Sequence, residues 1–324
     1  MAGLRKTAGR VTWGAAWGVT LFLSLVVLLR LAWHDGTWAL QILNGFTPYI
    51  LAPAWAVAAA AALARRWRLA ALAGVLVTAH THWVLIPALP QTSAPTMGRS
   101  FKIVSANLLV VNETPEILAA ELSDLDADVY CLQELSARWD AELERRGFWA
   151  RYPFNKRVTG ENPFGSAIAS RIPIRDLQVV ALAELPQLRG VLTLDGREIA
   201  ILNVHLLAPQ SPEDLPDFRS GAARLLREVE ALGSRTFVVA GDFNATPDSD
   251  FAARMRAFAD DGWEVAGRGF GFGFTWPNSV FALPSMRLDH VFISRDLTIS
   301  HIALGVGTGS DHRPLVSTFA RRQR

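Results

Sequence analysis

Three long stretches without Asp, Glu, Lys or Arg dominate the first part of this 324-residue chain. They cover residues 11–29, 38–64 and 69–89, and contain 19, 27 and 21 residues. A helix needs about 20 apolar residues to cross the hydrocarbon core of a bilayer. A cleavable signal peptide would explain only the first stretch, and three buried helices of this length in a row are unusual in a soluble protein. The sequence therefore predicts a membrane anchor over residues 1–89 with three transmembrane helices.

Basic residues indicate which ends of these helices face the cytoplasm. Arg5, Lys6 and Arg10 precede the first stretch, and three arginines within 65–68 separate the second from the third. The connection 33–37 contains no Lys or Arg. Because loops rich in Lys and Arg stay in the cytoplasm, three crossings place the chain after residue 90 outside it. We therefore expect a multi-pass protein of the cell membrane whose larger part is extracytoplasmic.

Charge is unevenly distributed along the chain. Residues 1–100 carry a net charge of +7, whereas residues 101–324 carry −5. The pI of about 9.0 therefore belongs to the N-terminal part, and the acidic remainder matches a nucleic-acid polyanion poorly. Residues 90–100 are expected to be a linker to a second domain, 101–324. Within the third stretch, His80 and His82 are candidates for a functional role, although a neutral His bonded to a neighbouring helix is the commoner arrangement.

From residue 101 the hydrophobic pattern becomes that of short strands and amphipathic helices. The segments FKIVSANLLV (101–110) and ADVYCLQEL (127–135) predict buried strands, each followed by a helix. Asp195 and Gly196 predict a hairpin turn. Helices alternate with strands early and strands dominate later, which favours two sheets covered by helices in one domain of about 220 residues. The single cysteine, Cys131, excludes a disulfide within the chain.

Polar residues follow several predicted strands at the point where each strand ends. In VVAGDFNATPDS (238–249), Asp242 and Asn244 are two residues apart, so their side chains would point the same way in an extended chain. A turn followed by a helix cap is the other interpretation of this stretch. Similar residues mark other strand ends: Asn107, Glu134, His205, Asp289, Asp311 and His312. Oxygen-rich sets of this kind suit Mg²⁺, Mn²⁺ or Ca²⁺.

Several other kinds of site are not supported by the sequence. It contains no HExxH motif and no Cys/His cluster, which argues against a zinc site of the thiolate or metalloprotease type. It also lacks the GxxxxGK[ST] phosphate loop and the GxSxG nucleophile motif. Metal-assisted chemistry at the strand ends is therefore the favoured interpretation.

Six segments resemble the endonuclease/exonuclease/phosphatase family, the DNase I-like metal-dependent phosphoesterases. They are SANL, LQEL, NVHL, GDFNATPDS, RLDHVFIS and GSDHRPL, in the family's order, and they cover nearly all of residues 101–324. The resemblance implies a DNase I-like four-layer α/β sandwich with the site at the ends of its two central sheets. It also implies hydrolysis of phosphate esters with Mg²⁺, or alternatively Mn²⁺.

The same resemblance implies which residues hold the metal and the attacking water. Glu134 would hold the metal, with Asn107 beside it and Asp311 nearby. Asp242 and Asn244 would position the water and a phosphoryl oxygen.

It further implies which residues contact the phosphate. His312 would contact the phosphate and be oriented by Asp289, and His205 would stabilise charge on the phosphoryl oxygens. Whether Asp242 or His312 takes the proton of the water is left open. His290 would point to the opposite face of its strand from Asp289 and is interpreted as structural.

The fold alone does not choose the substrate. Three N-terminal helices followed by an extracytoplasmic domain also resemble the membrane-anchored family members linked to glycopeptide-antibiotic resistance. That resemblance implies a phosphatase of a lipid-linked polyprenyl (undecaprenyl) pyrophosphate in cell-envelope metabolism. An extracytoplasmic nuclease or other phosphodiesterase is the alternative, and a non-catalytic binding module on a membrane anchor is a third interpretation.

One further segment bears on the substrate. The stretch GRGFGFGFTWPNSVFALP (267–284) is rich in glycine and aromatic residues. It is interpreted either as an ordinary core-and-turn segment or as a flexible apolar lip for a lipid-linked substrate. The sequence indicates no protein partner.

Overall fold

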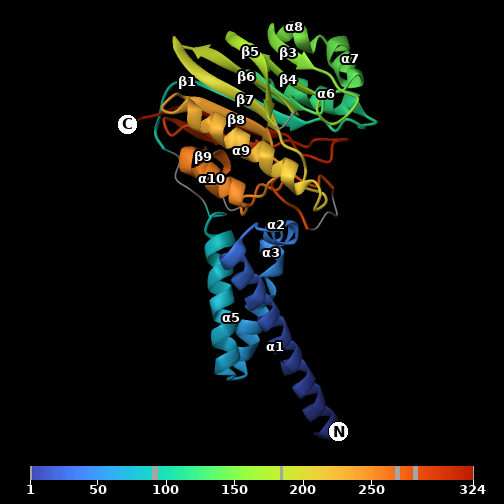
Figure 1. Ribbon diagram of the computed structural model, residues 1–324, viewed down its shortest axis with the longest axis vertical. Helices are drawn as coiled ribbons and strands as arrows, with labels where there is room; N and C mark the ends of the chain where they lie inside the picture. Colours follow the sequence, from blue (N-terminus) through green and yellow to red (C-terminus); the bar gives the residue numbers. More distant parts are fainter. Residues whose placement is uncertain (1, 90–93, 183–184, 267–270, 280–283, 324) are drawn as a thin grey trace. The chain divides into compact units, whose positions relative to one another are not determined.

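The computed structural model describes residues 2–89, 94–182, 185–266, 271–279 and 284–323, and only the backbone of residues 2–9. The chain forms two compact units. Unit 1 consists of residues 1–88 together with 248–250, and unit 2 consists of residues 89–247 and 251–324. Unit 1 is made of helices, whereas unit 2 combines sheets and helices (Figure 1).

Prolines divide the second uncharged stretch of unit 1 into several helices. The helices of this unit are α1 (Ala2–Trp33), α2 (Trp38–Gly45), α3 (Thr47–Ile50), α4 (Pro53–Leu63), α5 (Trp67–His80) and the π-helix η1 (Thr81–Leu85). Pro48 and Pro53 lie in the first turns of α3 and α4. Because proline has no N–H to donate, it fits the first turn of a helix and interrupts a longer one. The axis bends by 67° between α2 and the segment Thr47–Leu63.

The prediction of three transmembrane helices is therefore not confirmed. Within the described residues one helix, Arg10–Trp33, is long and apolar enough to cross a membrane, and the bent pair would be a second if it counts as one span. The third stretch is divided between α5, with 14 residues, and η1, with 5. At 1.5 Å per residue α5 alone is ~21 Å long, which is shorter than a hydrocarbon core of ~30 Å.

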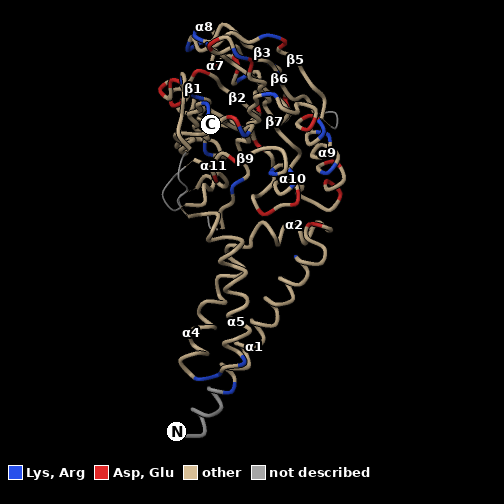
Figure 2. The backbone as a smooth tube through the Cα atoms, turned by 90° about the vertical axis from the view of Figure 1, so that its left-hand side faces the viewer, with Lys and Arg blue, Asp and Glu red and all other residues tan. Residues whose placement is uncertain are grey.

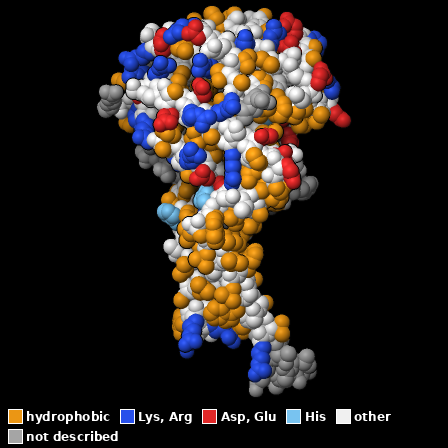
Figure 3. Space-filling model, in the orientation of Figure 1, with side chains coloured by type: hydrophobic (Ala, Val, Ile, Leu, Met, Phe, Trp, Pro, Cys, Tyr) orange, Lys and Arg blue, Asp and Glu red, His pale blue; other side chains and the backbone are white. Residues whose placement is uncertain are grey.

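The outside of unit 1 is nevertheless apolar. Leu21, Leu28 and Leu63 expose 57%, 61% and 87% of their surface. Hydrophobic side chains cover most of the visible face of these helices (Figure 3), and Lys and Arg gather at one end of them (Figure 2). At the α4–α5 connection, the Arg66 guanidinium lies 4.3 Å from the centre of the Trp13 ring of α1. A helical unit with an apolar outer surface suits a lipid environment better than water.

His80 has a structural role in unit 1. The Trp55 Nε1–H donates to His80 Nδ1 at 2.9 Å, and His80 Nε2 lies 3.1 Å from the carbonyl oxygen of Pro48. Because Nδ1 accepts and a carbonyl can only accept, the proton of His80 is on Nε2 and both ring nitrogens are bonded. The side chain thus joins α5 to α3 and α4, as expected for a neutral His between helices. His82 is exposed on η1.

Unit 2 contains two six-stranded sheets. Sheet A has the strand order β11 (Leu297–Leu304), β12 (Leu315–Arg322), β1 (Thr96–Asn107), β2 (Val129–Gln133), β4 (Ser166–Ser170) and β3 (Phe154–Val158). Sheet B has the order β5 (Ile174–Leu182), β6 (Leu185–Leu194), β7 (Arg197–His205), β8 (Phe237–Asp242), β10 (Asp289–Ile293) and β9 (Asp260–Asp261). The predicted hairpin turn joins β6 to β7, with φ values of 49° at Asp195 and 72° at Gly196.

Helices cover the outer faces of the sheets (Figure 1). Three pack against sheet A, namely α6 (Pro115–Asp124), α7 (Ala137–Arg145) and α8 (Phe148–Arg151), while α9 (Leu215–Leu232) lies along sheet B. Two shorter helices, α10 (Asp250–Phe258) and α11 (Gly262–Val265), follow β8 in the chain. Leu118 of α6 and Trp139 of α7 belong to the same buried cluster as Leu132 of β2. The predicted α/β sandwich of two sheets covered by helices is confirmed.

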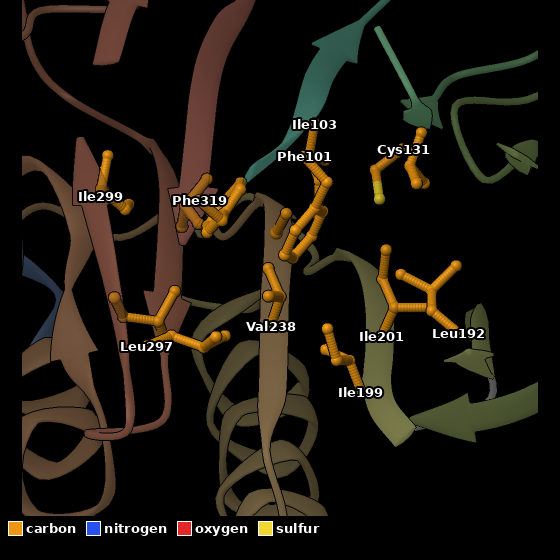
Figure 4. Packing of buried hydrophobic residues seen from close by; sticks show 14 of the residues in the cluster. Phe101, Ile103, Cys131, Leu192, Ile199, Ile201, Val238, Leu297, Ile299 and Phe319 are labelled. Carbon is orange, nitrogen blue, oxygen red and sulfur yellow. The ribbon is translucent and has the colours of Figure 1, made fainter. Parts of the chain in front are cut away.

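The main core of unit 2 lies between the two sheets. Phe101 of β1 and Phe319 of β12 occupy paired positions, and their ring centres are 5.2 Å apart. Ile201 and Val238 of sheet B belong to the same cluster (Figure 4). Strands β2, β4 and β8 are buried along their whole length, and none of them shows the alternation of apolar and polar residues that a half-exposed strand would have.

The central strands of both sheets end at the same edge of unit 2. β1 runs parallel to β2, with Asn107 opposite Gln133, and β7 runs parallel to β8, with His205 opposite Asp242. The antiparallel β10 places Asp289 opposite Asp242. Strand pairing therefore brings polar residues that are far apart in the sequence to one place.

Candidate active site

Seven of the eight predicted site residues form one cluster at this edge. Hydrogen bonds or ion pairs with heavy-atom distances of 4.0 Å or less connect them: Asn107, Glu134, His205, Asp242, Asn244, Asp289 and His312. The carboxylates of Asp242 and Asp289 are each only 1% exposed. Charged groups at this depth require partners, and the cluster supplies them from both sheets.

Asn107 joins two of the carboxylates. Its Nδ2 donates to Glu134 Oε1 at 2.9 Å and to Asp242 Oδ2 at 3.0 Å. The other oxygen of Glu134 accepts the backbone N–H of Val110 at 2.8 Å. Since one amide nitrogen has two protons, both are used in bridging carboxylates from sheet A and sheet B. The side chain of Asn107 therefore fixes the distance between Glu134 and Asp242.

Two site residues have backbones in the left-handed region, which non-glycine residues seldom adopt. Glu134 has φ 60° and Asn244 has φ 47°. Asn244 is held by its backbone N–H, which donates to Asp242 Oδ1 at 2.9 Å, and by its Nδ2, which donates to the carbonyl of Leu206 at 2.8 Å. Such conformations cost of order 1–3 kcal/mol and concentrate at functional sites. Here they turn both side chains toward the cluster as soon as the strands end.

His312 is bonded to Asp289 and faces Asp242. Its Nδ1 lies 2.8 Å from Asp289 Oδ2, and its Nε2 lies 3.6 Å from Asp242 Oδ2. Burial disfavours the imidazolium form, but attraction to Asp289 and Asp242 outweighs it and raises the pKa of His312 to about 10. In the metal-free protein His312 is therefore protonated at neutral pH, so it carries positive charge and can donate a proton but cannot accept one.

His205 approaches Asp242 from the end of β7. Its Nδ1 lies 3.1 Å from the carbonyl oxygen of Pro163, so Nδ1 carries a proton. Its Nε2 then points toward Asp242 Oδ2 at 3.6 Å and Glu134 Oε1 at 4.0 Å. The carbonyl contact orients the ring, and Nε2 is the atom available to a substrate.

Asp311 lies at the margin of the cluster. Its Oδ2 accepts the Nε1–H of Trp276 at 3.1 Å. Among the described residues no hydrogen bond or ion pair joins Asp311 to Asn107 or Glu134, the residues predicted to share a metal with it. Its negative charge still favours the protonated form of His312. The Trp276 contact could not be inferred from the sequence, because the two residues are 35 positions apart.

Two further residues support the site and were missed in the sequence. Ser310 Oγ donates to the carbonyl of Asn107 at 2.8 Å and accepts the backbone N–H of His312 at 3.1 Å, so it ties the end of β1 to the segment before β12. At Gly241, before Asp242, φ is 152°, and an added Cβ would lie 1.9 Å from the carbonyl oxygen of Val204 on β7. Only glycine allows this close approach of β7 and β8. The position of Gly241 at a strand end was the available signal.

The cluster can hold a divalent cation. Ligand atoms of Asp242, Asp289 and His312 lie within 4.8 Å of one another, and all three residues are buried. None of these three was predicted as a metal ligand; the predicted Glu134 and Asn107 adjoin them. The carboxylates close to one another repel unless positive charge balances them. Oxygen ligands in the majority are what hard cations such as Mg²⁺ prefer, so the residues fit such an ion.

The predicted apolar lip is only partly described. Residues 267–270 and 280–283 lie outside the described residues. In the described part, the rings of Phe272 and Phe274 stack with centres 5.2 Å apart. Gly273 lies against Trp263, where an added Cβ would be 2.4 Å from the indole ring. A role for this segment in binding an apolar chain stays a prediction.

Comparison with known proteins gives the class of the chain. Residues 104–312, more than half of it, match the model of the Endonuclease/Exonuclease/phosphatase family. The chain therefore belongs to this family, whose enzymes are hydrolytic phosphoesterases and nucleases that typically use a divalent metal. No similar sequence was found among curated proteins.

Solved structures agree with the fold. D. rerio TDP2 in complex with a single-strand DNA product is 19% identical, covers 68% of this chain and 99% of its own, and has a TM-score of 0.58. TDP2 from C. elegans, in a truncated form, is 18% identical, covers 69% of this chain and 99% of its own, and has a TM-score of 0.57. An endonuclease/exonuclease/phosphatase from Bacteroides vulgatus is 16% identical over a match that covers 69% of this chain and 100% of that chain, with a TM-score of 0.56.

Proposed function

We propose that the protein is a membrane-anchored, extracytoplasmic phosphoesterase that requires Mg²⁺ or Mn²⁺ and acts on a lipid-linked pyrophosphate of the polyprenyl type. The observation that carries the catalytic part is the buried cluster in which the Asp289–His312 pair and the Asn107–Glu134 pair meet at Asp242. A purely structural cluster would have no need for three carboxylates around one point.

The residues divide the chemistry among them. A cation, held by Glu134 with Asn107 beside it, would polarise the phosphoryl group. His312, protonated through its carboxylate neighbours, would bind a phosphoryl oxygen and neutralise the charge that develops there. His205 would stabilise charge on a second phosphoryl oxygen by donating from Nε2, which requires a proton on both ring nitrogens. Asp242 would take the proton of the attacking water, and Asn244 would help orient that water.

Membrane anchoring supports the choice of a lipid-linked substrate. The apolar surface of unit 1 suits lipid, and the basic residues at 5–10 and 65–68 favour an extracytoplasmic unit 2. Part of the predicted linker 90–100 belongs to β1, which begins at Thr96, so the chain from Ala88 to Thr96 spans at most ~30 Å. A substrate in the same leaflet then reaches the site at a high effective concentration, whereas a soluble substrate gains nothing.

Hydrolysis of nucleic acid is the second candidate. It is favoured by the similarity to D. rerio TDP2, which was crystallised with a single-strand DNA product. Against it stands the net charge of −5 over residues 101–324, which removes much of the electrostatic contribution to nucleic-acid binding.

A reconstitution assay distinguishes the two candidates. The full chain is placed in vesicles with Mg²⁺, and a lipid pyrophosphate is supplied either in the same vesicles or in separate ones, with single-strand DNA and a soluble sugar phosphate as further substrates. We expect fastest release of phosphate from lipid in the same vesicles. If DNA is cleaved faster than any lipid phosphate, the nuclease candidate replaces the phosphatase.

The proposed orientation has its own test. Alkaline phosphatase fused after Arg324 should be active, because that reporter works only outside the cytoplasm. A silent alkaline phosphatase together with an active cytoplasmic reporter at the same position would contradict the extracytoplasmic location.

A further inference from the structure

A small cavity lies in unit 2 near the start of β1, at the end of that strand opposite to Asn107. It has a volume of 150 Å³ and is lined by residues from both sheets. Arg99 lies near the start of β1, whose other end carries Asn107. Eight residues of strand at ~3.3 Å each separate the two, so the cavity is ~26 Å from the active site along that strand. It is therefore a distinct feature of the molecule.

Three arginines from separate segments line this cavity. Arg99 lies in an irregular part of β1, where the register with β12 shifts between Met97 and Phe101 and Gly98 has φ 76°. Arg197 follows the hairpin turn between β6 and β7, and Arg321 lies near the end of β12. Among the described residues, no ion pair or side-chain hydrogen bond involves any of these three guanidinium groups. Three separate segments of the chain thus each place in the lining of this cavity an arginine that has no ion-pair partner within the described part of the chain.

Acidic groups near the cavity do not cancel this charge. Asp195 lines it as well, so the lining has three positive charges and one negative charge. The Thr236 hydroxyl, also in the lining, donates to Asp296 Oδ2 at 2.5 Å. Arginine matches phosphate geometrically, because its planar group offers paired N–H donors. The charge balance and the donor type favour a phosphate group over a carboxylate.

The inner wall of the cavity is apolar. Phe101, Ile199 and Leu297 are 2%, 5% and 0% exposed and belong to the core between the sheets (Figure 4). The volume equals that of about five water molecules at ~30 Å³ each, and it is below the ~300 Å³ at which drug-sized pockets begin. The positive charge, the apolar inner wall and the volume of the cavity all fit a phosphate head group that carries the first carbons of an attached chain.

We propose that this arginine cavity, defined by Arg99, Arg197 and Arg321, binds the phosphate group of an amphiphile such as an anionic phospholipid. The inference goes beyond the proposed hydrolysis, and its choice of a lipid ligand rests on the proposed membrane anchor. Arg99 is 11 residues beyond Ala88, where unit 1 ends, so the connecting chain spans at most ~40 Å. In a membrane-anchored protein, lipid head groups lie within that reach.

The test measures binding to the full chain in non-ionic detergent with EDTA present, by isothermal titration calorimetry. The probes are dihexanoyl phosphatidic acid and inorganic phosphate. We expect the amphiphile to bind at least tenfold more tightly than inorganic phosphate. The triple variant Arg99→Gln, Arg197→Gln and Arg321→Gln should lose at least tenfold in affinity for the amphiphile and retain its hydrolytic activity.

A charge-matched control separates a defined cavity from general attraction. Arg224, Arg227 and Arg254 are exposed and lie outside the cavity lining. The triple change of these three to Gln removes the same charge and should leave affinity within twofold. If both triple variants lost the same affinity for the amphiphile, the cavity would not be its binding site. If inorganic phosphate bound as tightly as the amphiphile, the amphiphile would not be the preferred ligand.

Two further variants keep the result interpretable. Arg99→Gln alone, in an exposed segment, should weaken binding about threefold even if the triple variant does not fold. In His312→Gln, whose active site is impaired, binding of the amphiphile should be unchanged. Loss of binding in His312→Gln, with none in Arg99→Gln, would assign the ligand to the active site and contradict the proposal.

Discussion

Two buried Asp–His pairs lie on opposite faces of one strand, and only one of them is suited to chemistry. Asp289 and His290 are neighbours on β10. Asp289 holds His312 on the side of the active site, with 2.8 Å between Oδ2 and Nδ1. His290 points the other way and lies 3.1 Å from Asp261 Oδ2 through its Nδ1. The residue types and burial are the same, so the difference must come from what surrounds each pair.

We call Asp261–His290 the inner pair and Asp289–His312 the outer pair. In the inner pair, each side-chain nitrogen and oxygen has a hydrogen-bonding or ion-pair partner. His290 Nε2 lies 2.9 Å from the carbonyl oxygen of Ala245, and Arg287 donates to Asp261 Oδ1 at 2.7 Å. Burial opposes a charged carboxylate, yet Arg287 and His290 hold the pKa of Asp261 well below its usual range. By contrast, within the described residues His312 Nε2 has no hydrogen bond and faces Asp242 at 3.6 Å. The Asp289–His312 pair is therefore suited to catalysis, because His312 Nε2 can still form a hydrogen bond with a substrate.

The largest effect is expected on catalysis when the outer pair is broken. Asp289→Asn removes the charge that keeps His312 protonated and oriented, so kcat should fall by about 10²–10⁴. Steady-state kinetics on the best substrate would measure this, with thermal unfolding as a check on folding. His301→Gln, at an exposed histidine of β11, is the matched control and should leave kcat unchanged. Full activity of Asp289→Asn would contradict the distinction between the pairs.

Breaking the inner pair should instead reduce stability. Asp261→Asn leaves Arg287, which is 4% exposed, and His290 without their carboxylate. Removing one partner of a buried ion pair costs about 3–5 kcal/mol of unfolding free energy. Denaturant unfolding would show this loss, while kcat per folded molecule should change only a few-fold. A thousandfold loss of kcat with unchanged stability would reverse the assigned roles.

The sequence predicted which residues surround the Asp289–His312 pair, but it could not predict their backbone conformations and contacts. Asp242 and Asn244 follow an apolar run, and alternation along a strand already separates Asp289 from His290. The left-handed backbones of Glu134 and Asn244 could not be foreseen, because they depend on hydrogen bonds formed only after the sheets assemble. The same limit applies to the broken second stretch of unit 1, because its 67° bend depends on packing in three dimensions. Distant pairings such as Trp276 with Asp311 leave no local pattern.

The stability of the protein should depend on pH through His312. The pKa of His312 is about 10 in the metal-free folded protein and about 6.5 when unfolded. The contribution of His312 to the free energy of unfolding is therefore fully present below pH 6.5. It is lost as the pH rises toward 10, and it amounts to a few kcal/mol. Unfolding of wild type and His312→Gln with EDTA, between pH 6 and 10, should show the two stability curves converging as the pH rises. Parallel curves over this range would contradict a protonated His312.

A smaller effect is expected at the margin of the site. Trp276→Phe keeps an aromatic ring but removes the Nε1–H that donates to Asp311 at 3.1 Å. A hydrogen bond to a charged group is worth about 1.5–3 kcal/mol, so activity should fall by about 10- to 150-fold if Asp311 must be held in place. Trp263→Phe, which removes a donor to the carbonyl of Gly271, serves as the control and should have less effect on kcat. Equal effects of the two variants would remove Asp311 from the site.

A requirement for a divalent metal is the property on which the proposed active site depends most, because the cluster around Asp242 is explained by a cation and phosphate together. The full chain is stripped with EDTA and assayed on its fastest substrate, before and after Mg²⁺ or Mn²⁺ is restored, beside Glu134→Gln over a range of metal concentrations. A bound cation supplies several kcal/mol of transition-state stabilisation, so stripping should reduce the rate about a thousandfold, reversibly. Glu134→Gln should be impaired at low Mg²⁺ and partly rescued at high Mg²⁺. Full activity of the stripped wild type would contradict the account.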